Sequence, residues 1–239
     1  MQSKKFIAIS GGIGSGKSTL KDLLMAQLSL RGSQIRYSQT KALNFAGPVK
    51  EIEGFVKELP EELLCTLSCV NEAFDNYLRW TYSDLIEKVL GPYCLYRPRD
   101  LWSKWVQLLK ELNEMPLEPN QSKQRARLQF LGNEARERIA HDFWAGQAMV
   151  KAIGDYNFID DLRYLNEAEI LLAANTYFIL IDTPKEVRRQ RIESLGGVAT
   201  EEVFNHDSET QVERVREHIV HHHSSHYIVI DGQDPNFEG

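Results

Sequence analysis

The stretch that decides the fold is residues 6–20, Phe-Ile-Ala-Ile-Ser-Gly-Gly-Ile-Gly-Ser-Gly-Lys-Ser-Thr-Leu. Its first residues, Phe6 to Ile9, form a short apolar run that predicts a buried strand. Residues 11–18, called the glycine loop below, fit the pattern G-x-x-x-x-G-K-[ST], and helix-forming residues follow from Leu20 to Leu30. Strand, glycine loop and helix in this order are the context that a phosphate-binding loop requires. We therefore predict a nucleoside triphosphate site here.

The residue types of the glycine loop suit phosphate chemistry. Backbone N–H groups that turn inward around phosphate oxygens need backbone angles that only glycine adopts at low cost. The helix that follows adds free N–H groups and the positive end of its dipole. Lys17 supplies a point charge for the β- and γ-phosphates, and Ser18 can place its hydroxyl on Mg²⁺. The alternative is a glycine-rich turn that matches the pattern by accident, which the flanking strand and helix disfavour.

The composition excludes several classes of protein. The chain has 239 residues, 42% of them hydrophobic, and a formal net charge of −6. This size suits one α/β domain with insertions or two small domains, and the charge gives no basic field for coating nucleic acid. Three cysteines without a disulfide-rich pattern suit a reducing cytosol, and no apolar run approaches the roughly 20 residues that span a membrane. We expect a cytoplasmic protein with neither nucleic acid nor membrane as partner, and a homodimer stays open.

Apolar segments that recur along the chain predict the other strands of a sheet. They are Gln34–Ser38, Asn157–Asp161, Tyr177–Asp182 and Tyr227–Gly232. Helical patterns separate them, so the sequence predicts an α/β fold with a five-stranded parallel sheet flanked by helices. Ligands of such sheets bind at the carboxyl ends of the strands. That rim would carry the glycine loop and the carboxylates of Asp160, Asp161, Asp182 and Asp231.

Helices are predicted between the strand at Gln34–Ser38 and the strand at Asn157–Asp161. Pro48 fits the first turn of a helix that runs to about Glu58. Residues 60–120 read as a helical insertion within one domain of residues 1–239, interrupted by a loop at Leu95–Asp100. Two more helices are expected at 124–140 and 142–153. A mid-helix glycine costs about 1 kcal/mol relative to alanine, so Gly132 predicts a break or a close approach of a ligand.

Residues 183–209 form a predicted lid region. Thr183 is the expected N-cap of its helix and Pro184 the first helical residue, the helix stops at Gly196-Gly197, and residues 198–209 read as a loop. The helix carries several arginines, whose planar fork suits bidentate contacts to phosphate oxygens. Such a lid would close over phosphates and expel water. The plainer alternative for each arginine is a surface salt bridge.

Several of these stretches together resemble the deoxynucleoside monophosphate kinases of tailed bacteriophages, a branch of the P-loop nucleoside monophosphate kinase superfamily. The matching stretches spread over nearly the whole chain: Gly11–Thr19, Phe45-Ala-Gly-Pro-Val-Lys50, Arg125-x-Arg-Leu-Gln-Phe-Leu-Gly-Asn-Glu134, Trp144, Asp161-Leu-Arg163 with Glu167, and His206-x-Ser208-Glu209. The glycine loop is specific to the superfamily, whereas the other pieces in combination discriminate the branch. Where the family has threonine after Gly132, this chain has Asn133.

The resemblance implies a kinase that uses ATP and Mg²⁺ to convert deoxynucleoside 5'-monophosphates to diphosphates for DNA precursor synthesis. The implied ATP ligands are Gly14, Ser15, Gly16, Lys17, Ser18, Thr19, Arg191 and Asp231, with Ser18 on the metal. The implied acceptor ligands are Phe45, Ala46, Lys50, Arg127, Gln129, Gly132, Asn133, Trp144, Asp161, Arg163 and Glu167, with the helical insertion nearby. The implied catalytic residues, which would stabilise charge on the transferred phosphoryl group, are Lys17, Arg127, Arg163 and Arg188.

Two other interpretations of the same residues stay open. A dephospho-coenzyme A kinase would share both the glycine loop and the arginine-bearing lid. A non-kinase ATPase or switch would bind ATP at the loop and transfer no phosphate to an acceptor. A phosphoryl-transfer enzyme needs mainly positioning and charge neutralisation from its protein, and the number of arginines beside the predicted rim favours the kinase interpretation.

Overall fold

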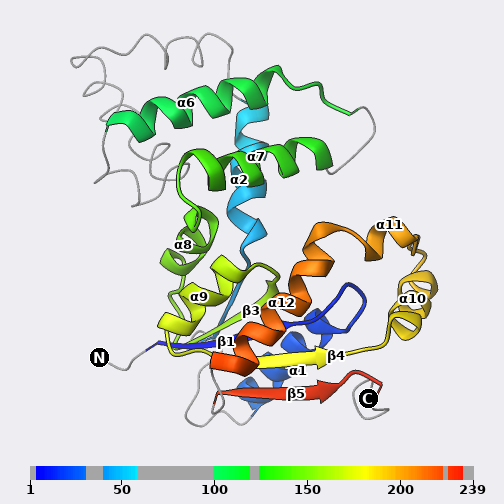
Figure 1. The fold of residues 1–239 in the computed structure, drawn as a ribbon. Coiled ribbons are helices and arrows are strands. Elements are labelled where there is room, and N and C mark those ends of the chain that lie inside the picture. Colours follow the sequence, from blue (N-terminus) through cyan, green and yellow to red (C-terminus); the bar gives the residue numbers. More distant parts are fainter. Residues whose placement is uncertain (1–3, 31–39, 59–98, 119–123, 223–225, 234–239) are drawn as a thin grey trace. The chain divides into compact units, whose positions relative to one another are not determined.

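The structure, a computed structural model, contains a five-stranded parallel sheet in the order β2-β3-β1-β4-β5 (Figure 1). The structure describes residues 4–30, 40–58, 99–118, 124–222 and 226–233. The strands are β1 (Lys5–Ser10), β2 (Thr40–Leu43), β3 (Tyr156–Leu162), β4 (Tyr177–Asp182) and β5 (Tyr227–Asp231). The predicted α/β fold, a five-stranded parallel sheet flanked by helices, is confirmed.

The burial of the strands follows their place in the sheet. β1 and β4 are neighbours inside the sheet, and the four residues from Phe178 to Ile181 of β4 are all buried. β5 lies at an edge and leaves Ile228 and Val229 about half exposed. The strand predicted at Gln34–Ser38 lies outside the described residues, and β2, which follows that segment, pairs with β3 at the edge of the sheet.

The described chain divides into two compact units, of which the first comprises residues 1–45 and 151–239. It contains the sheet. Its α9 and α12 lie side by side in front of the sheet, whereas α1 lies behind it (Figure 1). Behind the sheet, Ile9, Ile179 and Ile181 pack with Leu20 and Leu24 of α1. The helices of this unit are α1 (Lys17–Leu30), α9 (Leu165–Ala173), α10 (Lys185–Ser194), α11 (Glu201–Phe204) and α12 (Asp207–His222).

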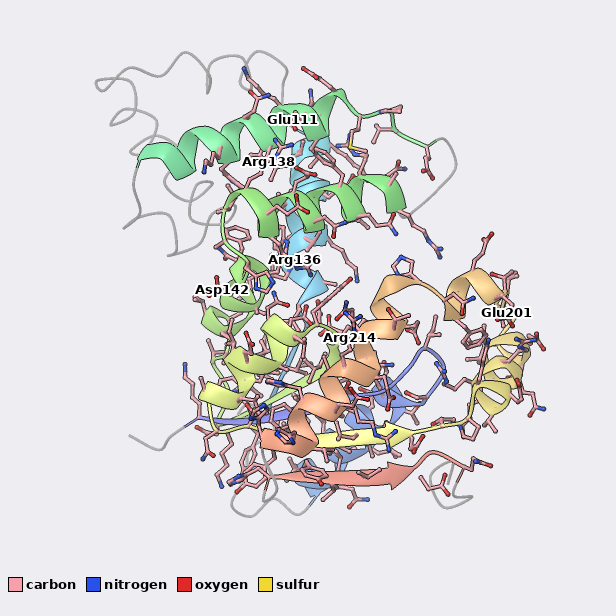
Figure 2. The ribbon with its side chains drawn as sticks, viewed as in Figure 1. Glu111, Arg136, Arg138, Asp142, Glu201 and Arg214 are labelled. Carbon is pink, nitrogen blue, oxygen red and sulfur yellow. The ribbon has the colours of Figure 1, made fainter. Side chains whose placement is uncertain are left out.

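The second unit, residues 46–150, is helical where it is described. Trp105, Phe143 and Trp144 lie together in its hydrophobic core. The ring centroid of Phe143 lies 5.1 Å from that of Trp105 and 4.8 Å from that of Trp144. Arg138 of α7 lies 2.8 Å from Glu111 of α6 and ties these helices together (Figure 2). Its helices are α2 (Ala46–Glu58), α6 (Arg99–Glu114), α7 (Arg125–Arg138) and α8 (Phe143–Val150).

The helical insertion predicted at 60–120 is described only in part. Residues 59–98 and 119–123 lie outside the described residues. α6 begins at Arg99, so the last two residues of the loop predicted at Leu95–Asp100 are helical. In the part of the chain that the structure describes, no helix is both long and apolar enough to cross a membrane.

Three local predictions are wrong in whole or in part. α7 runs through Gly132 without the predicted break, because Leu131 and Ala135 are buried on either side of it and their packing outweighs the cost of one glycine. The alternative, a close approach of a ligand at Gly132, stays a prediction. Thr183 is no N-cap, since α10 begins at Lys185 after Pro184 and Thr183 is buried. The loop predicted at 198–209 contains α11, whose Phe204 is buried.

Candidate functional site

The glycine loop joins β1 to α1 at the carboxyl end of β1, as predicted. Gly14 and Gly16 have φ angles of +75° and +92°. Residues with a Cβ rarely adopt this left-handed region, so the loop can take its shape only with glycine at these two positions. The N–H of Ser15 donates to the carbonyl of Gly12 at 3.2 Å, which closes the turn.

Lys17 lies at the end of the loop with its side chain folded back over it. Its Nζ donates to the carbonyl oxygens of Gly11 and Gly12, both at 2.7 Å. The pKa of Lys17 is lowered from 10.5 to about 8, mainly by burial and then by the charge of Arg163, while the charge of Glu209 acts in the opposite direction. The ammonium group therefore lies in a poorly solvated position where an anion would stabilise its charged form.

A carboxylate from α12 already lies on the loop. Oε2 of Glu209 accepts the backbone N–H of Ile13 at 2.8 Å and lies 3.1 Å from Nη1 of Arg188, while its Oε1 lies 2.9 Å from Nη1 of Arg163. The Glu209 side chain is 6% exposed. The three donors come from the glycine loop, the end of β3 and α10, and they meet around one anion.

Gly12 permits this close approach. A Cβ at position 12 would lie 2.0 Å from Nη1 of Arg188 and 3.0 Å from Oε2 of Glu209. No side chain larger than hydrogen fits there while the arginine keeps its place. The second residue of the loop is therefore a glycine for reasons of space.

The geometry fits an oxyanion such as phosphate. One N–H of the loop binds a carboxylate, and the buried hydroxyl of Ser15 has no hydrogen-bond partner among the described residues. An open pocket of about 160 Å³ adjoins the loop, and its lining includes Gly11, Asp182 and Arg216. Loop amides, two guanidinium groups and an ammonium group are the donors that phosphate oxygens accept best.

The remaining predicted ATP residues lie around the loop. Ser18 and Thr19 are exposed on the first turn of α1. Arg191 donates from Nη2 to the carbonyl of Gly232 at 2.8 Å, next to Asp231 at the end of β5. The structure thus brings the arginine of α10 and the turn after β5 together. No group of three or more His, Cys, Asp or Glu side chains among the described residues is arranged to hold a metal ion.

Two ion pairs hold the first half of the predicted lid region. Glu201 of α11 accepts from Lys185 at 2.6 Å and from Arg189, both on α10 (Figure 2 labels Glu201). The guanidinium groups of Arg188 and Arg189 lie 5.2 and 5.6 Å from the centre of the Phe204 ring. These contacts fix α11 against α10, which explains why residues predicted as a loop form a helical turn.

Four predicted acceptor residues of the first unit have defined local contacts. Asp161 accepts the backbone N–H of the buried Phe45 at 3.0 Å. Glu167 accepts the backbone N–H groups of Arg163 and Tyr164, at 3.0 and 3.1 Å, at the start of α9. The carboxylate of Glu167 therefore fixes the backbone from which the Arg163 side chain extends toward Glu209.

Arg127 in the second unit is 2% exposed. Its Nε lies 3.0 Å from Oε1 of Glu53, and its Nη1 donates to the carbonyls of Leu112 and Met115. Lys57 pairs with the other oxygen of Glu53 at 3.0 Å. These contacts join α2, the end of α6 and α7, so the described surroundings give Arg127 a structural task; its catalytic role stays a prediction.

The other acceptor residues of the second unit divide by exposure. Trp144 is buried, and its Nε1 donates to the carbonyl of Gly132 at 2.9 Å. Ala46, Lys50, Gln129 and Asn133 are exposed. Trp144 is thus a core residue whose polar edge is satisfied within the unit. The exposed set is accessible for ligand contacts, and its role in acceptor binding stays a prediction.

Glu209 is the residue of this site to which the sequence assigned no role. It appears in the sequence as one acidic residue of a matching stretch near the start of a predicted helix. Its partner Arg163 is 46 residues away and Ile13 is 196 residues away. One sequence signal could have suggested it: a carboxylate placed directly after an arginine-rich predicted lid that faces a phosphate site.

The sheet and its flanking helices define an α/β protein with a candidate anion site at the carboxyl ends of its strands. No family model and no curated protein matches the chain. Solved structures that match include the crystal structure of TT1252 from Thermus thermophilus, with a TM-score of 0.48 and 15% sequence identity over 98% of this chain and 92% of that chain.

Proposed function

We propose that this protein is a phosphotransferase that uses ATP to phosphorylate deoxynucleoside 5'-monophosphates. The observation that carries the proposal is the meeting of Arg163, Arg188 and the glycine-loop amide of Ile13 around one anion, with the ammonium group of Lys17 beside them. Phosphoryl transfer requires positioning and charge neutralisation far more than covalent chemistry from the protein. The arrangement offers donors for both tasks.

In the proposed reaction an oxygen of the acceptor phosphate attacks the γ-phosphorus of ATP. A bond forms between that oxygen and phosphorus, the bond to the β–γ bridging oxygen breaks, and ADP leaves. The acceptor phosphate is anionic at neutral pH, so the reaction needs no general base. Lys17, Arg163 and Arg188 would stabilise the charge on the transferred group. The Ser18 hydroxyl would hold Mg²⁺, which would supply further charge neutralisation for the phosphates.

The choice of acceptor rests on the resemblance to the phage kinases. The amide side chains of Gln129 and Asn133, both exposed on α7, could read base edges through paired donor and acceptor groups. Lys50, exposed on α2, could bind the acceptor phosphate. The product would enter DNA precursor synthesis in the cytoplasm, that of the host cell if the chain is encoded by a phage.

The test is a coupled assay of ADP release with ATP, Mg²⁺ and each deoxynucleoside monophosphate in turn. We expect turnover with at least one acceptor, and none above background for Lys17→Ala. Dephospho-coenzyme A as acceptor identifies the alternative kinase, and ATP binding without acceptor-dependent turnover identifies a switch. ADP release that no acceptor raises above background would refute the proposal.

A further inference from the structure

The anion that occupies the glycine loop in this structure is a side chain of the protein itself. The carboxylate of Glu209 accepts from one loop amide and from two arginines that start on other elements. Its side chain is 6% exposed, so its charge depends on these partners rather than on water. A phosphate group in the loop would need the same donors. The carboxylate and the phosphate cannot both accept the N–H of Ile13.

From this geometry we infer that Glu209 is a positioning residue with two opposed effects, an inference that rests on the proposed function. In the free protein it occupies part of the phosphate position and competes with the nucleotide. In the complex it withdraws from Ile13 but keeps its ion pairs with Arg163 and Arg188. The arginines then face the transferred phosphoryl group already oriented.

The contacts around Glu209 support both halves of this inference. Its two oxygens are divided, because Oε2 serves Ile13 and Arg188 while Oε1 serves Arg163. Loss of the Ile13 contact therefore leaves an ion pair on each oxygen. Arg188 also approaches the carbonyl of Ile13 at 3.4 Å, so the cluster lies directly against the loop. Glu209 sits in the first turn of α12, which anchors it on a regular element.

The inference predicts that affinity and turnover move in opposite directions when the charge is removed. In Glu209→Gln the competing anion is gone, so ATP and inorganic tripolyphosphate should each bind roughly fivefold tighter, the equivalent of one net hydrogen bond. The arginines lose their common partner, so kcat should fall between about tenfold and a hundredfold, as expected for misplaced catalytic groups. A residue with a merely structural role would not tighten binding.

The shorter acid Glu209→Asp separates the two effects. It keeps the negative charge near the arginines but retracts the carboxylate from Ile13 by one methylene. Binding of tripolyphosphate should again tighten, while kcat should fall less than in Glu209→Gln, because the arginines keep a negative charge near them. This variant also keeps the test decisive if Glu209→Gln folds poorly. Glu217, exposed two turns further along α12, provides the matched control, and Glu217→Gln should change neither quantity.

The experiment measures ATP and tripolyphosphate binding by calorimetry, kcat by ADP release and the melting temperature of all four proteins. Tighter binding with lower kcat in Glu209→Gln, and tighter binding with a smaller loss of kcat in Glu209→Asp, would support the inference. Equal or weaker binding in both variants would overturn it, even if the wild type is an active kinase. Conversely, a wild type that binds ATP without acceptor-dependent turnover refutes the kinase proposal, and the binding data still decide whether Glu209 competes with the nucleotide.

Discussion

Two glutamates in this protein, Glu53 and Glu209, are each nearly buried between two cations, yet their surroundings differ. Glu53 of the second unit pairs with Arg127 and Lys57. Nη1 of Arg127 also donates to two backbone carbonyls. Glu209 of the first unit pairs with two arginines that are 29% and 18% exposed. One cluster is closed by the fold, and the other opens on the glycine loop.

The difference between the two clusters shows why the sequence alone does not reveal whether an arginine has a structural or a ligand-binding role. A buried charge needs a partner, and a fully enclosed pair is retained because the loss of either member leaves the other unsatisfied. An ion pair whose arginines are partly exposed beside the glycine loop can exchange its partner for a ligand at much lower cost. The Glu53 cluster should therefore govern stability, and the Glu209 cluster should govern binding and turnover.

The largest effect that tests this comparison is expected for Arg127→Met. The substitution leaves Glu53 buried with Lys57 as its remaining cation and frees two backbone carbonyls. We expect the free energy of unfolding to fall by about 3 kcal/mol, the lower end for breaking a buried ion pair. Urea denaturation followed by circular dichroism measures it.

The matched control is Arg125→Met, since Arg125 is exposed on the first turn of the same helix. It should change the free energy of unfolding by no more than about 0.5 kcal/mol. A wild-type urea midpoint for Arg127→Met combined with lost turnover would break the comparison. Arg127 would then have the catalytic role that the resemblance implies.

A smaller effect concerns Lys17, the cation nearest the open cluster. Its pKa is lowered to about 8, so the free protein loses the ammonium charge above that pH. Nucleotide binding needs the charged form, and affinity for ATP should therefore fall about tenfold between pH 7 and pH 9. Calorimetry at the two pH values measures the change, and Lys17→Met should bind weakly but equally at both.

The same lowered pKa predicts an opposite trend in stability. Lys17 has an ordinary pKa of 10.5 when unfolded, so between about pH 8 and 10.5 the unfolded chain binds more protons than the folded one. The contribution of Lys17 to the free energy of unfolding then rises with pH across this window. ATP affinity that does not change between pH 7 and pH 9 would show that Lys17 lies away from the bound phosphates.

Features that depend on neighbouring residues could be predicted from the sequence. β4 was predicted with its observed bounds, Tyr177–Asp182, because a continuous apolar run is bounded by polar residues on both sides. The glycine loop was predicted in its place between β1 and α1, because its pattern and its flanking elements are contiguous. The five-stranded parallel sheet followed from the alternation of such runs with helices.

Features that depend on distant partners could not be predicted. Arg127 and Glu53 are 74 residues apart, and nothing local to either residue specifies the pair. Glu209 meets Ile13 only because α12 returns to the carboxyl end of the sheet. The unbroken α7 is a third case, since the packing of Leu131 and Ala135 decides whether one glycine interrupts the helix. Propensity is a weak predictor when tertiary packing opposes it.

The smallest expected effect contrasts a glycine of each unit. At Gly132 a Cβ would meet one atom, Nη1 of Arg136 at 3.7 Å, which is an ordinary contact, whereas at Gly12 it would overlap Nη1 of Arg188. Gly132→Ala should therefore raise the free energy of unfolding by about 0.5–1 kcal/mol through helix propensity. Gly12→Ala should leave stability nearly unchanged and weaken ATP binding by displacing Arg188. Urea denaturation measures the stability of both variants, calorimetry their ATP binding, and ADP release their KM for the acceptor. If Gly132→Ala raises this KM without added stability, Gly132 contacts the ligand. The second unit is then less closed than the Glu53 cluster indicates.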